Sequence, residues 1–320
     1  MEDRRMTIKL AVIMDPIESI KAHKDSTFAM LLEAQRRDWE LYYITPNSLY
    51  VIDGNSYGQT SRLYVEDNES AWFRTEAAMN IMLASFDVIL MRKDPPFDME
   101  YIYTTYILEL AKNSGSLVIN DPAALRNCNE KFSIMNFPQC CVPTVVTCNQ
   151  SKILEFIDEY EEIIVKPMDA MGGKSIFKIL RQDKDKKNVV DKMTQQGNTT
   201  IMTQRFIPEI TQGDKRILII NGEPVPYALA RIPKEGELLG NLAAGGRGEG
   251  IALTERDYWI CSEIKDSLVD NSIYFAGIDV IGSYLTEINI TSPTCIRELD
   301  KQFNLNISAQ LFDEIEASLT

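Results

Sequence analysis

Residues 279–290, DVIGSYLTEINI, predict two short strands joined by a tight glycine-serine turn. Glu287 and Asn289 are two residues apart on the second strand, so both side chains leave the same face of the hairpin. Asp279 lies on the first strand, which the turn brings alongside. Oxygen ligands without histidine or cysteine suit Mg²⁺, which keeps waters and phosphate oxygens in its shell. A solvated sheet face gives similar alternation, but residues 275–281 are too apolar for a surface strand.

Upstream, residues 163–175, IIVKPMDAMGGKS, predict a strand, a glycine-containing turn and the start of another strand. The Gly-Lys-Ser triplet resembles a P-loop, but that motif needs a glycine five residues before Gly173, where Met168 stands. Lys166 follows an apolar run, and its burial is costly unless an anion meets it. The turn therefore indicates a phosphate site, with an ordinary hairpin and a solvent-reaching lysine as the alternative.

Thirteen of the 16 glycines fall between residues 172 and 282, and six of these between 236 and 250. The glycine-rich stretch predicts a mobile lid over a reactive intermediate, with a disordered surface loop as the alternative. Basic residues flank it. Lys215 and Arg216 open a predicted strand, Arg231 ends the next strand, and Arg247 closes the glycine-rich stretch. Together they suit an anionic substrate, because a guanidinium binds carboxylate or phosphate with paired hydrogen bonds.

The first 130 residues alternate strand and helix patterns, which predicts a Rossmann-like α/β domain with a parallel sheet. No glycine precedes Gly54, so a dinucleotide-binding turn after the first strand is excluded. From about residue 130 onward the chain becomes rich in predicted strands. The expected elements are strands at 9–14, 41–44, 87–92, 117–120, 163–168, 175–181, 200–206, 214–221, 224–232, 273–281 and 284–290, a hairpin at 49–65, and helices at 26–35, 99–112 and 308–319.

The composition restricts the class of function. The chain has 320 residues and a net charge of −14, which argues against nucleic-acid or membrane partners. That total conceals a cationic segment, because residues 163–256 hold 15 bases and 11 acids, whereas residues 257–320 hold three bases and 11 acids. The six cysteines show no CxxC spacing, which favours reduced thiols and a cytoplasmic protein. His23 is the only histidine, so acid-base catalysis by histidine is not expected.

Several longer segments match segments of one known family and follow one another in the same order. They are MRKDPPFD at 91–98, NEK at 129–131, VKP at 165–167, DKR at 214–216, GEPVP at 222–226, ARIP at 230–233, NLAAGGRG at 241–248 and LTEINITSPT at 285–294. On these segments the C-terminal two-thirds resembles the ATP-grasp ligases, and the whole chain resembles the bacterial glutathione synthetases.

The resemblance implies a Rossmann-like N-terminal domain at residues 1–126 and an ATP-grasp fold at 127–320, in which two α+β subdomains clasp ATP. The central, lid-like subdomain would cover about 131–207. The implied reaction joins γ-glutamylcysteine to glycine, giving glutathione, ADP and phosphate through an acyl phosphate. It would use ATP with Mg²⁺ or Mn²⁺. The resemblance also implies a cytoplasmic homotetramer.

The resemblance assigns a role to each matching residue. Lys131, Lys166, Met171, Gly172, Gly173, Gln204, Arg205, Phe206, Ile207 and Asp214 would bind ATP, the four from Gln204 to Ile207 as the hinge beside adenine. Asp279, Glu287 and Asn289 would bind the metal. Arg216, Arg231 and Arg247 would be catalytic, and Arg92, Arg231, Asn289, Ser292 and Thr294 would bind the peptide and amine substrates. Loops 170–173 and 232–247 would close over them, although Ala170 stands where the family usually has glycine.

Two alternatives remain open at this point. A different ATP-grasp ligase, such as a D-alanine ligase or a glutamate-adding ligase, would join another carboxylate to another amine. A non-catalytic ATP-binding regulator, for which the synapsins give a precedent on this fold, would bind ATP without turnover.

Overall fold

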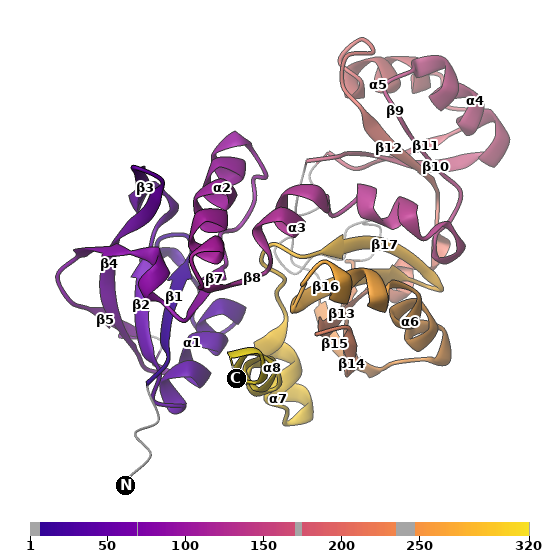
Figure 1. The fold of residues 1–320 in the computed structure, drawn as a ribbon. Helices are drawn as coiled ribbons and strands as arrows, with labels where there is room; N and C mark the ends of the chain where they lie inside the picture. Colours follow the sequence, from indigo (N-terminus) through magenta and orange to yellow (C-terminus); the bar gives the residue numbers. More distant parts are fainter. Residues whose placement is uncertain (1–6, 69, 170–174, 235–246, 320) are drawn as a thin grey trace, which may run out of the picture.

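The computed structural model describes residues 7–68, 70–169, 175–234 and 247–319. The predicted ATP contacts Met171, Gly172 and Gly173, together with Ala170 and most of the glycine-rich stretch, lie outside the described residues. Three β-sheets follow one another along the chain (Figure 1).

The first sheet has the strand order β3-β4-β2-β1-β7-β8, and β5 and β6 also pair with β4. Its strands are β1 (Lys9–Ile13), β2 (Glu40–Ile44), β3 (Leu49–Ile52), β4 (Asn55–Val65), β5 (Phe73–Thr75), β6 (Met79–Met82), β7 (Val88–Met91) and β8 (Leu117–Ile119). The predicted parallel sheet is confirmed for β2, β1, β7 and β8, and the predicted hairpin at 49–65 adds antiparallel strands at one edge. Strand β1 is apolar throughout its buried part because both faces of the sheet are covered.

Two helices belong to this first unit, α1 (Ser26–Arg36) and α2 (Met99–Asn113). Helix α1 begins where expected, since the Oδ1 atom of Asp25 accepts a hydrogen bond of 2.7 Å from the backbone N–H of Phe28. The loop between β1 and α1 and the loop between β7 and α2 leave the carboxyl ends of neighbouring parallel strands. Such ends form one edge of a sheet, which is where open α/β sheets bind ligands.

The second and third sheets lie beyond the short helix α3 (Pro122–Asn127). The second has the order β11-β10-β12-β9, and the third β15-β14-β13-β16-β17. Their strands are β9 (Thr144–Thr147), β10 (Glu162–Pro167), β11 (Phe177–Leu180), β12 (Ile201–Arg205), β13 (Asp214–Ile220), β14 (Glu223–Ile232), β15 (Arg247–Ala252), β16 (Phe275–Ile281) and β17 (Tyr284–Asn289). Every strand predicted between residues 163 and 290 is present.

The sequence analysis missed four helices in this part of the chain. They are α4 (Gln150–Tyr160), α5 (Lys186–Met193), α6 (Glu255–Asp270) and α7 (Ile296–Phe303). Helix α6 carries readable signals, because Thr254 and Asp257 form a capping box and Ile260, Ile264 and Leu268 recur every four residues on its buried side. None of the helices in the described ranges is long and apolar enough to cross a membrane.

The C-terminal helices return to the first sheet. Helix α8 (Ile307–Leu319) packs against α1, and the ring of Phe312 stacks on Trp39 with centroids 4.9 Å apart (Figure 1). Glu33 of α1 joins the two helices electrostatically, since it accepts hydrogen bonds from Arg37, which follows α1, and from Asn306, which precedes α8. Burial alone would raise the pKa of Glu33, but hydrogen bonds from Arg36, Arg37 and Asn306 lower it to about 2.

We expect Glu33→Gln to lower the free energy of unfolding by about 2 kcal/mol at neutral pH. Because the pKa of Glu33 falls from 4.5 to about 2 on folding, its contribution is present above pH 4.5 and is lost as the pH falls towards 2. The free energies of unfolding of the parent and of Glu33→Gln, measured in urea, should therefore become more alike as the pH falls through this range. Glu316→Gln, at the exposed partner of Arg37, should change stability by less than about 1 kcal/mol. A pH-independent difference for Glu33→Gln would contradict the assignment.

Candidate active site

One cavity of about 580 Å³ lies where the three sheets meet. The second sheet contributes β10 and β12, the third contributes β13, β14, β16 and β17, and the first contributes the two loops at its carboxyl edge. Most of the predicted site residues line it. They are Lys131, Lys166, Gln204, Arg205, Phe206, Ile207, Asp214, Arg216, Arg231, Asp279, Glu287, Asn289, Ser292 and Thr294.

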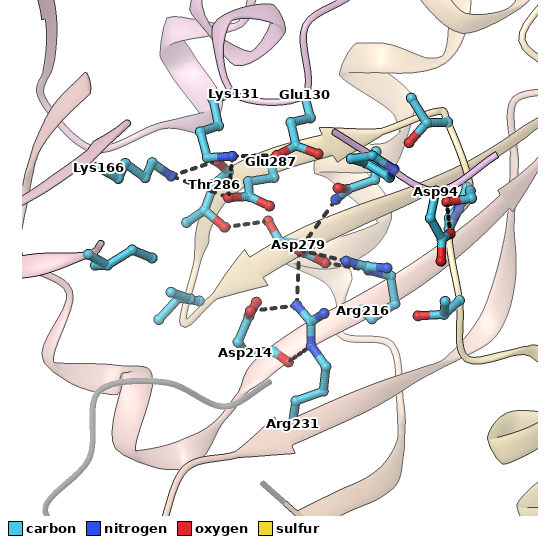
Figure 2. A pocket seen from close by; sticks show the side chains of 18 of the residues that line it. Asp94, Glu130, Lys131, Lys166, Asp214, Arg216, Arg231, Asp279, Thr286 and Glu287 are labelled. Atoms are coloured by element: carbon cyan, nitrogen blue, oxygen red, sulfur yellow. Dashed lines mark hydrogen bonds and ion pairs between the residues drawn. The ribbon is translucent and has the colours of Figure 1, made fainter. Parts of the chain in front are cut away.

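The β16–β17 hairpin brings the predicted metal ligands together. Asp279 and Glu287 are paired across the hairpin, and the amide Nδ2 of Asn289 donates to Asp279 Oδ2 over 3.3 Å. Figure 2 shows Asp279 and Glu287 on one face of the hairpin, between the lysines and the arginines. The period of two in the strand therefore predicted the common orientation of Glu287 and Asn289 correctly.

Asp279 is also the centre of a buried ion-pair network. Its carboxylate accepts hydrogen bonds from Arg216 Nε over 2.5 Å and Arg216 Nη2 over 2.9 Å, and Arg231 Nη2 lies 2.9 Å from Oδ2 (Figure 2). Burial alone would raise the pKa of Asp279, but the two guanidinium groups hold it well below its usual range. The carboxylate thus stays ionised and fixes both arginines at the cavity wall.

Asp214 shares Arg231 with Asp279. Arg231 Nη2 donates to Asp214 Oδ2 over 2.5 Å, and burial raises the pKa of Asp214 to about 6 in spite of that partner. The other oxygen, Oδ1, is buried and has no hydrogen-bond partner among the described residues. Asp214 therefore offers an unused acceptor in the wall of the cavity.

Two lysines from different parts of the chain approach Glu287. Lys131 precedes a short 3₁₀ helix (Phe132–Asn136), and Lys166 lies on β10 of the second sheet. Each Nζ atom is 3.8 Å from Glu287 Oε1, and Lys166 Nζ also donates to the Thr286 carbonyl over 3.3 Å (Figure 2). Burial lowers the pKa of Lys166, whereas for Lys131 the charges of Glu287 and Glu130 outweigh burial and raise the pKa. Buried ammonium groups facing a cavity are suited to phosphate oxygens.

The end of β12 and the two residues that follow it form one wall of the cavity. Gln204 Nε2 donates to Thr144 Oγ1 over 3.0 Å, and Lys178 Nζ lies 3.7 Å from the centre of the Phe206 ring. Several isoleucines that the sequence analysis did not assign complete this wall: Ile164, Ile176, Ile210 and Ile281. They were missed because an isoleucine in such a segment is equally suited to a core. An apolar slot with a few polar groups suits a planar base.

The donor set fits a hard divalent cation that is also held by phosphate. Glu287 and Asn289 supply a carboxylate and an amide oxygen, and the side chain of Glu287 is 22% exposed. No group of three or more histidine, cysteine, aspartate or glutamate residues within the described ranges is placed to hold a metal alone. Mg²⁺ commonly takes one or two carboxylates and completes its shell with water and substrate phosphate. The residues therefore fit Mg²⁺ as a companion of a nucleotide.

Two predicted residues lie apart from the cavity wall. Arg92 is buried behind it, where Nη2 donates to the Pro293 carbonyl over 2.9 Å and Nε donates to Thr27 Oγ1 over 3.0 Å. Arg247 is exposed on β15 and forms an ion pair of 2.9 Å with Glu249. A substrate-binding role for Arg92 and a catalytic role for Arg247 stay predictions.

The structure adds acidic residues to the cavity that sequence reasoning did not assign. Glu130 contacts the Lys131 ammonium, and burial followed by repulsion from Glu287 raises the pKa of Glu130. Asp94 Oδ1 accepts a hydrogen bond of 2.5 Å from Ser292 Oγ, which joins the first sheet to the segment after β17. Glu130 lies in the segment NEK and Asp94 in MRKDPPFD. Both segments match the family, but the sequence analysis gave these two residues no role.

His23 is exposed on the β1–α1 loop. We expect His23→Ala to leave kcat/KM within about twofold of the parent, as for most surface substitutions. The pH profile of kcat/KM should have the same shape for the variant and for the parent. Loss of one limb of that profile would show that His23 takes part in proton transfer.

The three sheets, with a cavity lined by lysines, arginines and an acidic hairpin, define an ATP-grasp ligase. Solved structures with this fold cover nearly the whole chain. A D-cycloserine synthetase superposes with a TM-score of 0.66 at 12% identity, covering 98% of this chain and all of that chain (100%). A D-alanyl-alanine synthetase A from Vibrio cholerae gives 0.58 at 14% identity, each chain being covered to 98%.

Sequence comparison gives the family within this class. The models for the N-terminal domain and the ATP-grasp domain of prokaryotic glutathione synthetase match residues 8–126 and 130–304. The chain is 51% identical over 314 residues to a glutathione synthetase of Pseudomonas aeruginosa, covering 98% of this chain and 99% of that protein. One from Escherichia coli is 49% identical over 312 residues with the same coverage. The chain belongs to the prokaryotic glutathione synthetase family, as the sequence resemblance implied.

Proposed function

We propose that the protein forms glutathione in two steps within this cavity. The cysteinyl carboxylate of γ-glutamylcysteine attacks the γ-phosphorus of ATP, the bond to the leaving ADP breaks, and an acyl phosphate forms. The amine of glycine then attacks the acyl carbon, a C–N bond forms, phosphate leaves and the amine loses its proton. The observation that supports this most directly is the joining of the lysines, the paired arginines and the acidic hairpin in one cavity.

Phosphoryl transfer depends mainly on positioning and charge neutralisation. Lys131 and Lys166 would hold the phosphates, and the hinge from Gln204 to Ile207 would hold adenine. Asp279, Glu287 and Asn289 would hold Mg²⁺ or Mn²⁺. When bound, the cation supplies positive charge to the transferring phosphoryl group. No histidine is needed for these roles.

Arg216 and Arg231 would stabilise the negative charge that moves from the attacking carboxylate to the phosphoryl group. Their exposed fractions are 7% and 6%, and Asp279 holds both guanidinium groups in place before any substrate enters. Preorganised donors of this kind need little rearrangement in the transition state, which is the main source of their effect on rate. The roles of Met171, Gly172, Gly173 and Arg247 remain part of the proposal by family resemblance.

The proposal extends to the organisation of the protein. We divide the chain into an N-terminal domain at 1–126 and an ATP-grasp domain at 127–320, with a central subdomain at about 131–207 that contains the second sheet. One face of α2 exposes the apolar side chains of Met99, Tyr103 and Tyr106. This exposed face supports assembly of copies into the homotetramer implied by the family. All six cysteines are free thiols, which supports a reducing, cytoplasmic location.

Isotope transfer tests the reaction and its intermediate together. The protein is incubated with ATP, Mg²⁺, glycine and γ-glutamylcysteine labelled with ¹⁸O in the cysteinyl carboxylate. We expect ADP and glutathione in equal amounts, with one labelled oxygen in the released phosphate. Glutathione with unlabelled phosphate would exclude the acyl phosphate. ADP formed with D-alanine but not with γ-glutamylcysteine would indicate another ligase, and ATP binding without turnover would indicate a regulator.

A further inference from the structure

The far end of the cavity is formed by the first sheet and has no role in the chemistry described above. The β1–α1 loop contributes Lys21, Lys24 and Asp25 to the cavity wall, and α7 contributes Glu298. This end is connected to the acidic hairpin by the segment that follows β17, because Ser292 donates to Asp94 and the charge of Asp94 acts on Asp25.

The cations of the cavity differ in their partners. Lys166, Arg216 and Arg231 all face carboxylates of the third sheet, chiefly Glu287 and Asp279. Lys24, by contrast, has no side-chain hydrogen bond or ion pair within the ranges that the structure describes. It is half-buried, and Glu298 is the carboxyl group on which its charge acts. Lys24 is thus a cation in the cavity wall that forms no ion pair with a carboxylate of the described residues.

Glu298 makes the same end of the cavity complementary to a zwitterion. Its Oε2 atom is buried without a hydrogen-bond partner among the described residues. An ammonium group and a carboxylate group in the same part of the cavity wall match the carboxylate and ammonium groups of a free α-amino acid unit. An unsatisfied buried carboxylate oxygen is costly, so a ligand that donates to it gains affinity.

The substrate has such a unit at the end that does not react. γ-Glutamylcysteine is joined through its side-chain carboxyl, so the α-carboxylate and α-ammonium of glutamate remain free. In an extended peptide the α-carboxylate lies roughly 9 Å from the reacting cysteinyl carboxylate, because the γ-linkage adds two methylene groups to the path between them. With the reacting carboxylate between the lysines and the arginines of the third sheet, Arg216 and Arg231, the glutamyl end extends toward the first sheet.

Arg92 is the obvious cation for that second carboxylate, but its guanidinium is already engaged. It donates to the Pro293 carbonyl and to Thr27, and it does not line the cavity. Lys21 lines the cavity, but it is exposed, so a charge there is screened by water. Lys24 combines a place in the wall with partial burial, which strengthens its attraction for an anion.

We infer that Lys24 binds the glutamyl α-carboxylate of the peptide substrate and so selects γ-glutamyl peptides. This inference rests on the proposed reaction. It assigns a specificity residue to the β1–α1 loop of the N-terminal domain, whereas the reacting groups come from the second and third sheets.

Three peptides test this role. They are γ-glutamylcysteine, 4-aminobutyryl-cysteine, which lacks the α-carboxylate, and glutaryl-cysteine, which lacks the α-ammonium. For Lys24→Met we expect kcat/KM with the two carboxylate-bearing peptides to fall on the order of 10- to 100-fold, as for the loss of a charge-assisted hydrogen bond. Activity with 4-aminobutyryl-cysteine and the KM for ATP should be unchanged, because neither involves the lost contact.

Two further variants serve as controls. Lys24→Arg should retain most of the discrimination between γ-glutamylcysteine and 4-aminobutyryl-cysteine. Lys301→Met, at an exposed lysine of α7 that does not line the cavity, should behave as the parent protein. An equal fall for all three peptides, or no fall for any, would overturn the inference. A selective loss in Lys21→Met instead would assign the role to that lysine and would also overturn it. Failure of the parent protein to use γ-glutamylcysteine would contradict the proposed function itself.

Discussion

Glu287→Gln is expected to lower kcat by on the order of 10³-fold or more while the protein keeps its fold. Glu287 Oε1 lies 3.8 Å from the ammonium groups of both Lys131 and Lys166. Removal of its charge disturbs the two cations that would hold the phosphates, and at the proposed metal site it would replace a charged oxygen ligand by a weaker neutral one. Glutamine has the same shape, and the pairing of β17 with Asp279 on β16 is made by the backbone.

The test compares kcat, the dependence on Mg²⁺ and the urea unfolding curve of the variant with those of the parent. We expect the Mg²⁺ concentration at half-maximal activity to rise, because binding of a hard cation depends on the number of charged oxygen ligands. Glu155→Gln is a matched control, since Glu155 is an exposed partner of Lys152 on α4. Unimpaired Mg²⁺-dependent activity in Glu287→Gln would show that this carboxylate is not a ligand.

The site could be predicted from the sequence to the extent that it depends on local geometry. Alternation along residues 284–289 places Glu287 and Asn289 on one face, and the tight turn brings Asp279 opposite. The contacts between Asp279 and the two arginines have no such local origin. They arise because β13 pairs with both β14 and β16, so that Arg216 lies directly beside Asp279. Strand order in a sheet is a long-range property that spacing alone does not determine.

The role of the first sheet was also beyond prediction from the sequence. Asn120, which follows β8, donates through Nδ2 to the carbonyls of Phe275 and Ile290 over 2.7 and 2.6 Å. Arg92 holds the Pro293 carbonyl, and Asp94 accepts from Ser292. Side chains of the first sheet therefore position the segment after the acidic hairpin. The recognised segment MRKDPPFD indicated that these residues matter, but not that Arg92 contacts backbone.

Asp279→Asn is expected to have the largest effect on stability, a fall of about 3–5 kcal/mol in the free energy of unfolding at neutral pH. Arg216 and Arg231 are only 7% and 6% exposed, so their charges are largely removed from water. Asp279 compensates both through contacts of 2.5 to 2.9 Å. Asparagine keeps one acceptor but no charge, and loss of one member of a buried ion pair leaves the others uncompensated. Urea unfolding without nucleotide measures this difference, and activity should fall as well.

Asp214→Asn is the informative comparison, because Asp214 contacts the same Arg231 but its pKa is shifted in the opposite direction to that of Asp279. Burial raises the pKa of Asp214 to about 6 from 3.8, so ionisation disfavours the folded state and stability falls as the pH rises through this range. At neutral pH, loss of this charge removes an unfavourable contribution together with an ion pair. The net change should therefore be smaller than for Asp279→Asn. Equal destabilisation by both variants would show that the arginines depend on the two carboxylates alike. Glu287→Gln should lower kcat without lowering the free energy of unfolding. Compared with Asp279→Asn and Asp214→Asn, it therefore separates residues that activate the substrate from residues that hold the two arginines.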